Sequence, residues 1–560
     1  MKIDIRSECV ATMYVDSSST SRGDKIYTRH LLRESFREDG KVKHRTVANL
    51  SHCSPQEVAA IKLALQHKDD LSVLTSIQEV CLEQGQRVGA VLCLHAIAQR
   101  LGIPQALGAH RQGHLALWQV FARLIDQGSR LSAVRLAQSH AACEVIGLEP
   151  FCEDHLYENL AWLAEHQAEI EKRLFRRRYG KAVPQLFLYD VTSTYLEGDG
   201  NALAAFGYNR DGKKGKKQIV VGLLTGPDGM PVAVRAFRGN TPDPQTVSEQ
   251  VRILAQAFGV EEVVLVGDRG MVKSKQMALL EDADFHYITA ITKPQIRSLL
   301  KKNILQLELF DEQLSEVVHA SGRYVLRRNP VRQREIAASR EDRLARLHEL
   351  AARQNQYLLD HPRAKVETAE AKLSSRLLAY GVGGFVSVEV GERSLSIKID
   401  EEAKQEAAVL DGCYVLTTDL PVLALSKEAV HDRYKDLAKV EWAFRTWKNG
   451  HLELRPVHVH TEESTRGHIF VVMLAYLIER ELDSLWCGLE TTVPEALDQL
   501  GSLCGTIATV HETTCQKIPK PNETVGKFLE AAGVRLPEVL PGPRVRVATR
   551  CKLVPRRKSA

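Results

Sequence analysis

The sequence lacks the features that would place it outside ordinary globular proteins. Aromatic residues are few, at 6% of its 560 residues, but 44% of the residues are hydrophobic and 26% are charged, an ordinary globular composition that argues against a wholly disordered or fibrous chain. The longest uninterrupted apolar run, Ile469 to Ile478, is too short to cross a bilayer. Met1 to Ser17 carries charges and has no apolar segment typical of a secretion signal. We therefore expect a cytoplasmic protein of about three or four domains.

The sequence also lacks a metal-binding cysteine pattern and a large net charge. No two of the eleven cysteines have the Cys-x-x-Cys spacing of a zinc finger, so we expect reduced, mostly buried thiols. The 75 basic and 70 acidic side chains give a formal charge of 75 − 70 = +5. This balance permits a nucleic-acid partner without requiring one, and the local distribution of charge must decide.

Basic side chains gather around a predicted hairpin near the N-terminus. Asp39-Gly40 is a strong turn signal between two strand-like segments. The flanking cations are Arg29, Arg33, Arg37, Lys41, Lys43 and Arg45. They either contact nucleic acid or form the solvated face of a sheet. In the helical segment that follows, residues 95–104 fit either a DNA-reading helix-turn-helix or an ordinary packed pair of helices.

The centre of the chain predicts an α/β layer with a mixed sheet. The expected strands are 186–189, 219–224, 232–237, 263–266 and 286–291, and the expected helices are 243–257 and 273–281. We divide the chain into a basic β-hairpin region (1–54), a helical domain (55–180), a core in two parts (181–291 and 426–490), an α+β insertion (292–425) and a C-terminal region (491–560). Val539 to Ala560 contains no acidic residue and is expected to form a basic tail.

Three acidic residues are the candidates for chemistry. Asp190 directly follows the expected strand 186–189, and Asp268 follows Val263 to Gly267. An aspartate after a strand usually caps the next turn, but functional groups in open α/β sheets also gather where strands end. We expect the third acid, Glu441, to lie on a helix.

The helix predicted over 426–449 carries Glu441 on a polar face. Tyr434, Glu441 and Lys448 are spaced by seven residues and share one side, which Arg445 joins. A solvated stripe with a Glu441–Arg445 ion pair is the simpler interpretation. The apolar residues around Glu441 indicate instead a packed helix whose carboxylate has a specific role.

Together these motifs resemble the bacterial insertion-sequence DDE transposases of the "insertion sequence four" group, in the branch with a Tyr-Arg-Glu-Lys signature and an insertion in the core. The resemblance covers roughly 185–480. The stretches that carry it are 189–195, 206–211, 267–270, 434–437 and 440–445. Leu437 stands where this group often has arginine, so one phosphate contact implied by the resemblance is missing. The insertion has no tryptophan, and this second departure puts hairpin formation on the transposon ends in doubt.

The resemblance implies a ribonuclease-H-like fold in which Asp190, Asp268 and Glu441 are catalytic and bind two Mg²⁺ ions, with Mn²⁺ as a substitute. Two such ions can activate the attacking oxygen and steady the leaving oxygen of a phosphodiester displacement. The implied reaction cuts the ends of an insertion sequence and joins their 3′-hydroxyl groups to target DNA. The implied partners are double-stranded DNA, as inverted-repeat ends and as target, and a second copy of the chain in a synaptic homodimer. The implied location is the bacterial cytoplasm, associated with the nucleoid when DNA is bound.

Several cations are expected to contact DNA. Lys448 and Tyr434 are candidates for phosphate binding, and Arg269 and Arg445 either contact phosphate or pair with the acids. The loop 210–217 has five cations and one acid, and it either follows a DNA backbone or is a solvated turn. Its cations are Arg210, Lys213, Lys214, Lys216 and Lys217. It is not a Walker loop, because Lys214 replaces the required Ser or Thr.

Two other functions fit the same residues. The chain is alternatively a structure-specific nuclease of the same fold without strand transfer, or a DNA-binding regulator with an inactive core.

Overall fold

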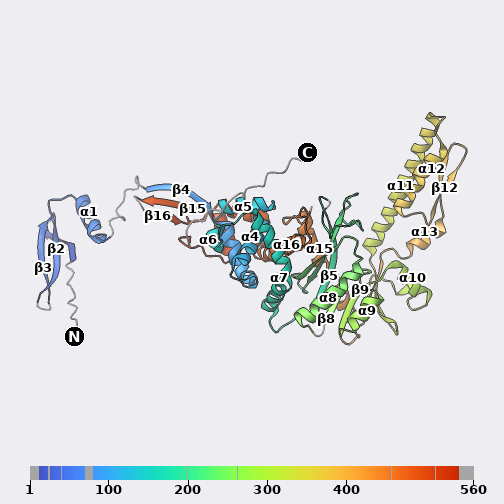
Figure 1. Ribbon diagram of the computed structural model, residues 1–560, viewed down its shortest axis with the longest axis horizontal. Helices are drawn as coiled ribbons and strands as arrows, with labels where there is room; N and C mark the ends of the chain where they lie inside the picture. The colour runs from blue at the N-terminus through green and yellow to red at the C-terminus, as the bar shows by residue number, and fades with distance from the viewer. Residues whose placement is uncertain are drawn as a thin grey trace, which may run out of the picture. The chain divides into compact units, whose positions relative to one another are not determined.

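The computed structural model describes residues 12–22, 25–38, 41–69, 80–198, 200–260, 263–455, 457–510 and 513–540. The chain forms two units (Figure 1). The first contains Met1–Val88, Ser502–Asn522 and Leu536–Gly542, and the second contains Gly89–Gly501, Glu523–Arg535 and Pro543–Ala560. The predicted turn at Asp39-Gly40 and the tail beyond residue 540 lie outside the described residues. Among the described helices, none is long and apolar enough to span a membrane.

The first unit begins with an antiparallel sheet of β1 (Thr12–Arg22), β2 (Lys25–Glu38) and β3 (Lys41–Asn49), followed by α1 (Pro55–Gln66). The pairing of the predicted hairpin is present, with Glu38 opposite Lys41. Three of its cations are paired within this sheet. The ion pairs are Arg33–Asp16 at 3.0 Å, Lys43–Glu38 at 2.6 Å and Arg45–Glu34 at 2.5 Å. These pairs favour the solvated-face interpretation for those three side chains.

A second small sheet of this unit joins distant parts of the chain. Its order is β16 (Thr513–Lys517), β15 (Cys504–Val510) and β4 (Val80–Arg87), all antiparallel. The helical prediction over 55–180 is wrong at β4. This strand forms because it pairs with β15, more than 400 residues later, and local periodicity does not reveal a partner so far away.

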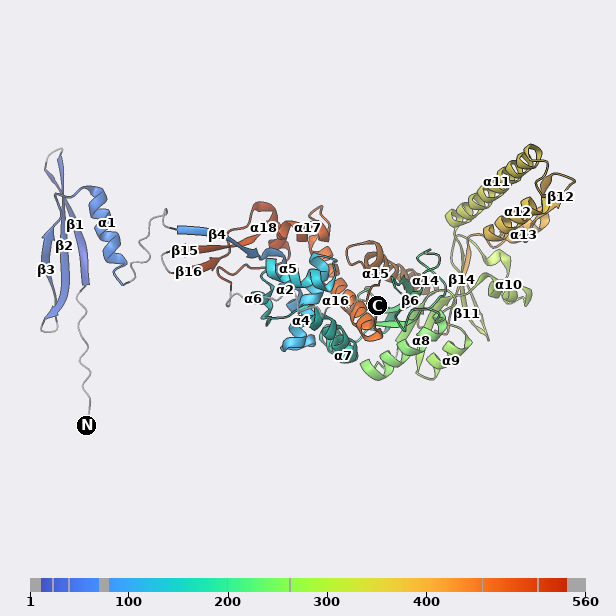
Figure 2. The ribbon, with the colours of Figure 1, turned by 45° about the horizontal axis from the view of Figure 1, so that its top comes forward.

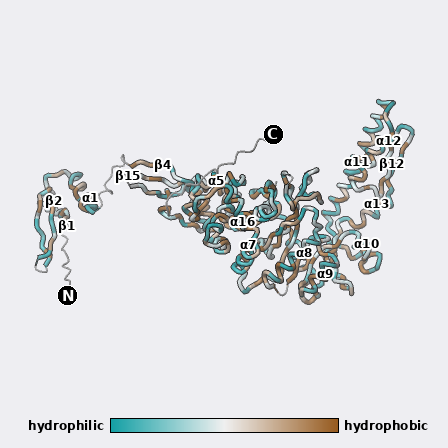
Figure 3. Tube along the Cα trace, viewed as in Figure 1, coloured by the Kyte–Doolittle hydropathy of each residue, from teal (hydrophilic) through white to brown (hydrophobic). Residues whose placement is uncertain are grey.

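The helical part of the second unit is built around one long buried helix. α16 (Glu462–Trp486) contains the apolar run identified in the sequence and packs against α4 and α7 (Figure 3, hydrophobic residues in brown). The surrounding helices, several of which Figure 2 shows beside it, are α2 (Gly89–Leu101), α3 (Ile103–Leu107), α4 (Arg111–Ile125), α5 (Arg130–Ser139), α6 (Ala142–Ile146), α7 (Glu153–Tyr179), α17 (Val493–Leu500) and α18 (Glu523–Ala531).

The candidate helix-turn-helix is a packed pair of helices. α3 has five residues, and Ile103, Ala106 and Leu107 in it are buried. A recognition helix must present side chains to a DNA groove, which a short buried helix does not do.

The core is an eight-stranded mixed sheet in the order β10-β11-β14-β9-β8-β5-β6-β7. β5 is parallel to β8, and β8 is parallel to β9, whereas all other neighbours are antiparallel. The bounds are β5 (Leu186–Tyr195), β6 (Gln218–Thr225), β7 (Pro231–Arg238), β8 (Val263–Gly267), β9 (Phe285–Ala290), β10 (Ser315–His319), β11 (Gly322–Arg328) and β14 (Cys413–Thr418). The apolar runs noted in the sequence are thus inner strands of this sheet, except for β7, which forms one of its edges.

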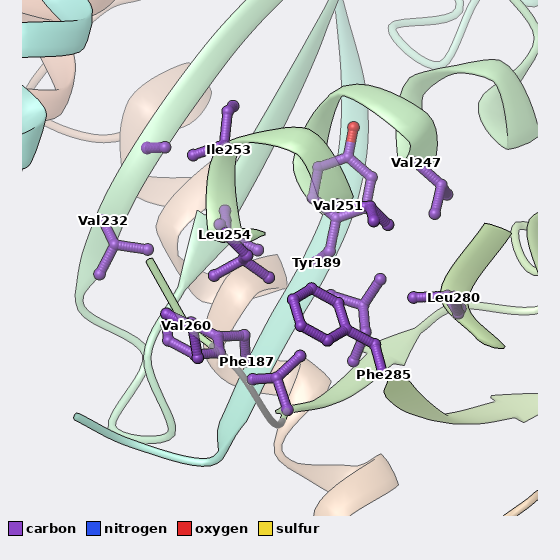
Figure 4. Close-up of a cluster of buried hydrophobic side chains, with 14 of the residues drawn as sticks. Phe187, Tyr189, Val232, Val247, Val251, Ile253, Leu254, Val260, Leu280 and Phe285 are labelled. Atoms are coloured by element: carbon purple, nitrogen blue, oxygen red, sulfur yellow. The ribbon is translucent and has the colours of Figure 1, made fainter. Parts of the chain in front are cut away.

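Helices cover this sheet on both sides. α8 (Asp243–Arg252), which continues as η3 (Ile253–Phe258), and α9 (Ser274–Glu281) pack on one face. Figure 4 shows this core, where Phe187 and Tyr189 of β5 lie among Val251, Leu254 and Phe285. α15 (Leu437–Asn449) packs against β5, and α14 (Lys427–Lys435) packs near β8, β9 and β14. The helix predicted over 426–449 is therefore two helices, joined at Asp436.

The segment expected to be an insertion has two parts. β10, β11 and β14 extend the core sheet beyond β9. Residues 330–408 leave the sheet with a hydrophobic core of their own, which includes Leu344, Leu347 and Leu373. The elements between residues 292 and 412, apart from β10 and β11, are α10 (Lys293–Lys301), η4 (Leu307–Leu309), α11 (Pro330–Asp360), α12 (Val366–Tyr380), β12 (Val386–Val390), β13 (Leu395–Ile399) and α13 (Glu401–Ala408).

The cysteines are free thiols in the described part of the chain, as expected. Their burial is only partly as expected. Cys93, Cys143, Cys152 and Cys413 are buried, whereas Cys81, Cys487 and Cys515 are exposed.

The contact of α16 with α7 depends on Gly467. A Cβ at this position would lie 2.0 Å from the backbone oxygen of Leu160. Alanine normally favours a helix over glycine, yet here it must push two helices apart. We expect Gly467→Ala to destabilise the protein by about 1–3 kcal/mol, measured by thermal and denaturant unfolding. Gly526→Ala on α18 is the matched control, since a Cβ there meets nothing within 4 Å. Equal stability of the two variants would contradict the close helix contact.

Candidate active site

Asp190 and Asp268 lie side by side on neighbouring strands. Tyr189 of β5 pairs with Gly267 of β8, so each aspartate directly follows one member of this pair. The side chains of Tyr189 and Val191 enter the core that α8 covers, and alternation along a strand directs Asp190 to the opposite face, against which α15 packs. β5 does not end at residue 189, as predicted, but continues to Tyr195 because β6 pairs with it.

Tyr434 of α14 holds the carboxylate of Asp268. Its hydroxyl donates a hydrogen bond to Oδ1 of Asp268 at 3.0 Å. Burial raises the pKa of Tyr434, and the charge of Asp268 raises it further, so the hydroxyl stays protonated at neutral pH. The backbone oxygen of Asp268 also accepts a hydrogen bond from Oγ1 of Thr289 at 3.1 Å. These contacts fix an aspartate that is otherwise exposed.

The three predicted acids share one electrostatic environment. Burial raises the pKa of Asp190 to about 7, the charges of Asp268 and Glu441 raise it as well, and Arg210 opposes them. Glu441 lies on α15 and is exposed, and none of the described residues holds its carboxylate by a hydrogen bond or ion pair. The alternative Glu441–Arg445 ion pair is not formed. Arg445 instead stacks over the ring of Trp442, with its Cζ 5.5 Å from the ring centroid.

Asp268 and Glu441 line a cavity of about 560 Å³. Its other walls are the end of β9, the beginning of α11 and the beginning of β14. The cationic side chains that line it are Arg269, Lys293, Arg332 and Lys435. Arg269 is exposed in the same turn as Asp268. A cavity with carboxylates on one side and cations around it suits an anionic substrate that binds together with a metal ion.

The acids have the donor chemistry for hard divalent cations. Mg²⁺ prefers carboxylate and phosphate oxygens, and a buried acid whose pKa is raised by two neighbouring acids is stabilised by added positive charge. Within the described ranges, however, no three His, Cys, Asp or Glu side chains form a ready metal-ligand cluster. The carboxylates therefore have the right chemistry for a divalent cation, but their positions in this structure do not form a complete set of metal ligands.

The basic loop 210–217 is partly neutralised by its own domain. Nη2 of Arg210 lies 2.6 and 2.7 Å from the carboxylate oxygens of Asp243, and Lys216 pairs with Glu197 at 2.6 Å. Lys213 lies over the ring of Tyr195, with its Nζ 5.7 Å from the ring centroid. Lys214 is exposed and Lys217 is half-buried.

Lys448 forms a buried ion-pair cluster with this loop. Its Nζ donates to Oδ1 of Asp211 at 2.8 Å, and Nη1 of Arg455 donates to the same oxygen at 2.7 Å. Only 9% of the Lys448 side chain and 1% of the Asp211 side chain are exposed. The structure therefore places Lys448 against Asp211 and away from solvent. Sequence reasoning missed Asp211 and Arg455, although the single acid in a loop of five cations was a usable signal.

Two protein-family models match parts of the chain. The model described as "IS1634 family transposase, N-terminal domain" matches residues 16–73. The model described as "Transposase DDE domain" matches residues 181–478, more than half of the chain. Among solved structures, the chain is similar to a piggyBac transposase in a synaptic complex with hairpin DNA, with a TM-score of 0.35 and 9% sequence identity over 69% of each chain. A search of curated proteins gave no match.

The raised pKa of Asp190 predicts a pH-dependent stability. The folded state binds this proton more tightly than the unfolded chain, whose aspartate has an ordinary pKa of 3.8, so the free energy of unfolding falls as pH rises from about 4 to 7. We expect Asp190→Asn to be more stable than the wild type at pH 8 without divalent cations, with the difference shrinking toward pH 4, in thermal unfolding. Asp282→Asn, at an exposed position, is the control and should change nothing. A destabilised D190N at pH 8 would contradict the burial of a charged Asp190.

The ion-pair cluster predicts a structural cost for losing Asp211. Asp211→Asn leaves the buried Lys448 without its counter-charge, and such losses destabilise by about 3–5 kcal/mol. Adding Lys448→Met should recover part of the loss, as measured by denaturant unfolding. Asp228→Asn is the matched control, because its ion pair with Arg178 is more exposed and should contribute about 1 kcal/mol or less. If D211N were as mild as D228N, Lys448 would not depend on this pair.

Proposed function

Because the chain belongs to the DDE transposases of the IS1634 family, we propose that it cuts phosphodiester bonds at the ends of an insertion sequence and joins the freed 3′-hydroxyl groups to target DNA. The family is a more specific description than the "insertion sequence four" group that the motifs suggested. The observation that carries the proposal is the placement of the three acids: Asp190 and Asp268 each follow one member of the Tyr189–Gly267 pair, and α15, which carries Glu441, packs against β5.

The proposed core is ribonuclease-H-like. Support comes from the strand order β7-β6-β5-β8-β9, with β6 antiparallel to β5 and with β8 and β9 parallel to it. In this arrangement the first aspartate lies on the first strand, the second follows the fourth strand, and the glutamate lies on a later helix. Strands β14, β11 and β10 then extend the sheet toward the insertion.

In the proposed mechanism Asp190, Asp268 and Glu441 hold two divalent cations, Mg²⁺ or in its place Mn²⁺. Bound cations would neutralise the acids and polarise the phosphodiester. Tyr434 keeps the carboxylate of Asp268 in place through its hydrogen bond. The carboxylate of Glu441 is exposed and forms no ion pair among the described residues, so it is available to bind a cation.

The proposed DNA contacts divide the predicted cations into two groups. Arg269, Arg445 and Lys214 are exposed, so we assign them to phosphates of double-stranded DNA, either transposon ends or target. Lys213 and Lys217 are weaker candidates in the same loop. Lys448, Arg210 and Lys216 are held by carboxylates of this chain, so we assign them to positioning α15 and the loop. Since one chain offers one triad, we also propose a homodimer to process two ends.

The three acids should be required for cleavage but not for DNA binding. We expect Asp190→Asn, Asp268→Asn and Glu441→Gln each to abolish Mg²⁺- or Mn²⁺-dependent nicking of end DNA, while gel-shift affinity for that DNA stays within about twofold. Asp282→Asn is again the matched control and should nick at the wild-type rate.

A joining assay with pre-cut ends separates the proposal from its alternatives. A transposase joins these ends to a target plasmid, whereas a nuclease without strand transfer only nicks, and an inactive regulator does neither. Metal-dependent nicking that survives in any of the three acid variants would contradict the proposed site.

A further inference from the structure

A second cavity, of about 310 Å³, lies within the second unit between the helical part and the segment that follows α15. Its floor holds Arg123 of α4, Arg130 at the start of α5 and His468 of α16, and each is only 6% exposed. Its mouth is formed by residues that reach solvent, which are Ser129, Tyr157, Glu453 and His458. The cavity is thus open at one side and strongly basic at its base.

The two arginines on the floor have only neutral hydrogen-bond partners. Arg130 donates to Oε1 of Gln119 and, at 3.3 Å, to Nδ1 of His468. Arg123 donates from Nη1 to the backbone oxygen of Gln127 at 2.7 Å. The Nε of Arg123 is buried and has no hydrogen-bond partner among the described residues. Each guanidinium therefore carries a charge that no carboxylate contacts directly.

Two buried like charges at one place are costly. Burial lowers the pKa of Arg123 to about 10 and that of Arg130 to about 9, and the charge of Arg123 lowers that of Arg130 further. Glu453 at the exposed mouth and Asp126 each offset part of the charge of Arg123 without contacting it directly. An uncompensated buried cation costs several kcal/mol unless an anion joins it.

The local backbone adds to this preference for an anion. α5 begins at Arg130, with Ser129 as its N-cap, and both residues line the cavity, so the positive end of the helix dipole lies at it. Arg455 also lines the cavity and donates to Asp211, which holds Lys448 of α15. Arg455 and Asp211 therefore connect the cavity to α15, the helix that carries Glu441.

We propose that this cavity is a binding site for a phosphate group, held by Arg123 and Arg130 at the N-terminus of α5. The phosphate comes either from a DNA backbone or from free phosphate, since both present the same oxyanion to the two guanidinium groups. The site is separate from the proposed cleavage chemistry, because it uses none of the three acids.

The first test measures phosphate binding without DNA. Ser129→Asp keeps a good N-cap residue and places a carboxylate at the mouth of the cavity. By isothermal titration with inorganic phosphate at constant ionic strength, the wild type should bind one phosphate per chain, and S129D should bind it about tenfold or more weakly because of like-charge repulsion. Ser54→Asp, the same change at the N-cap of α1, is the matched control and should bind as the wild type does.

Arg123→Gln provides a second, independent variant and should also lose phosphate binding. Circular dichroism establishes that each variant is folded before titration. Absence of phosphate binding in the wild type, or phosphate binding as tight as that of the wild type in both S129D and R123Q, would overturn the proposal. These titrations do not measure DNA cleavage, so they test the phosphate site independently of the function proposed for Asp190, Asp268 and Glu441.

A competition experiment identifies the source of the phosphate. If duplex DNA displaces bound phosphate and binds S129D more weakly than S54D, the site takes a backbone phosphate. If phosphate binding is unchanged by DNA, the site takes free phosphate.

Discussion

The repulsion among three acids at the end of β8 is the constraint on which the rest of the site depends. Asp190 is half-buried, and both its desolvation and the charges of two neighbouring acids make its carboxylate less stable as an anion. The fold does not relieve this strain with a direct ion pair. Asp268 and Glu441 line a cavity that also carries cationic side chains, and Tyr434 fixes Asp268 by a hydrogen bond. In the proposed function, a bound divalent cation would stabilise the ionised acids.

The cations around this site have different tasks because their burial differs. Lys448 and Arg455 converge on Asp211 inside the protein, so they tie α15 to the loop 210–217. Arg269 and Arg445 remain at the surface, where they can meet phosphates. Farther into the helical part, Arg123 and Arg130 are buried and donate hydrogen bonds only to neutral groups. The cations of this unit thus fall into three groups: those paired with a carboxylate, those exposed at the surface, and those buried with neutral hydrogen-bond partners.

Much of the core follows from the sequence because its signals are local. The apolar runs of β5, β6, β8 and β9 predict strands that lie inside the sheet, and that of β7 predicts the strand at its edge. The seven-residue spacing of Tyr434, Glu441 and Lys448 predicts one helix face, but Tyr434 lies on α14 and the other two residues on α15. The parts that were missed depend on partners far away in the chain. β4 forms through β15, β5 is lengthened by β6, and Lys448 is neutralised by Asp211. The break at Asp436 is likewise a tertiary effect, because the residues on either side are good helix formers.

The most direct test of the shared site is the proton balance of cation binding. Mn²⁺ should bind to the ionised form of Asp190, whose pKa is about 7, and displace its proton. Isothermal titration of Mn²⁺ in buffers with different ionisation enthalpies measures this release. The account predicts release of about one proton at pH 6, none at pH 9, and none at either pH in D190N. Mn²⁺ binding with no proton release at pH 6, or with the same release in D190N, would contradict an Asp190 carboxyl group that has a raised pKa and loses its proton when a cation binds.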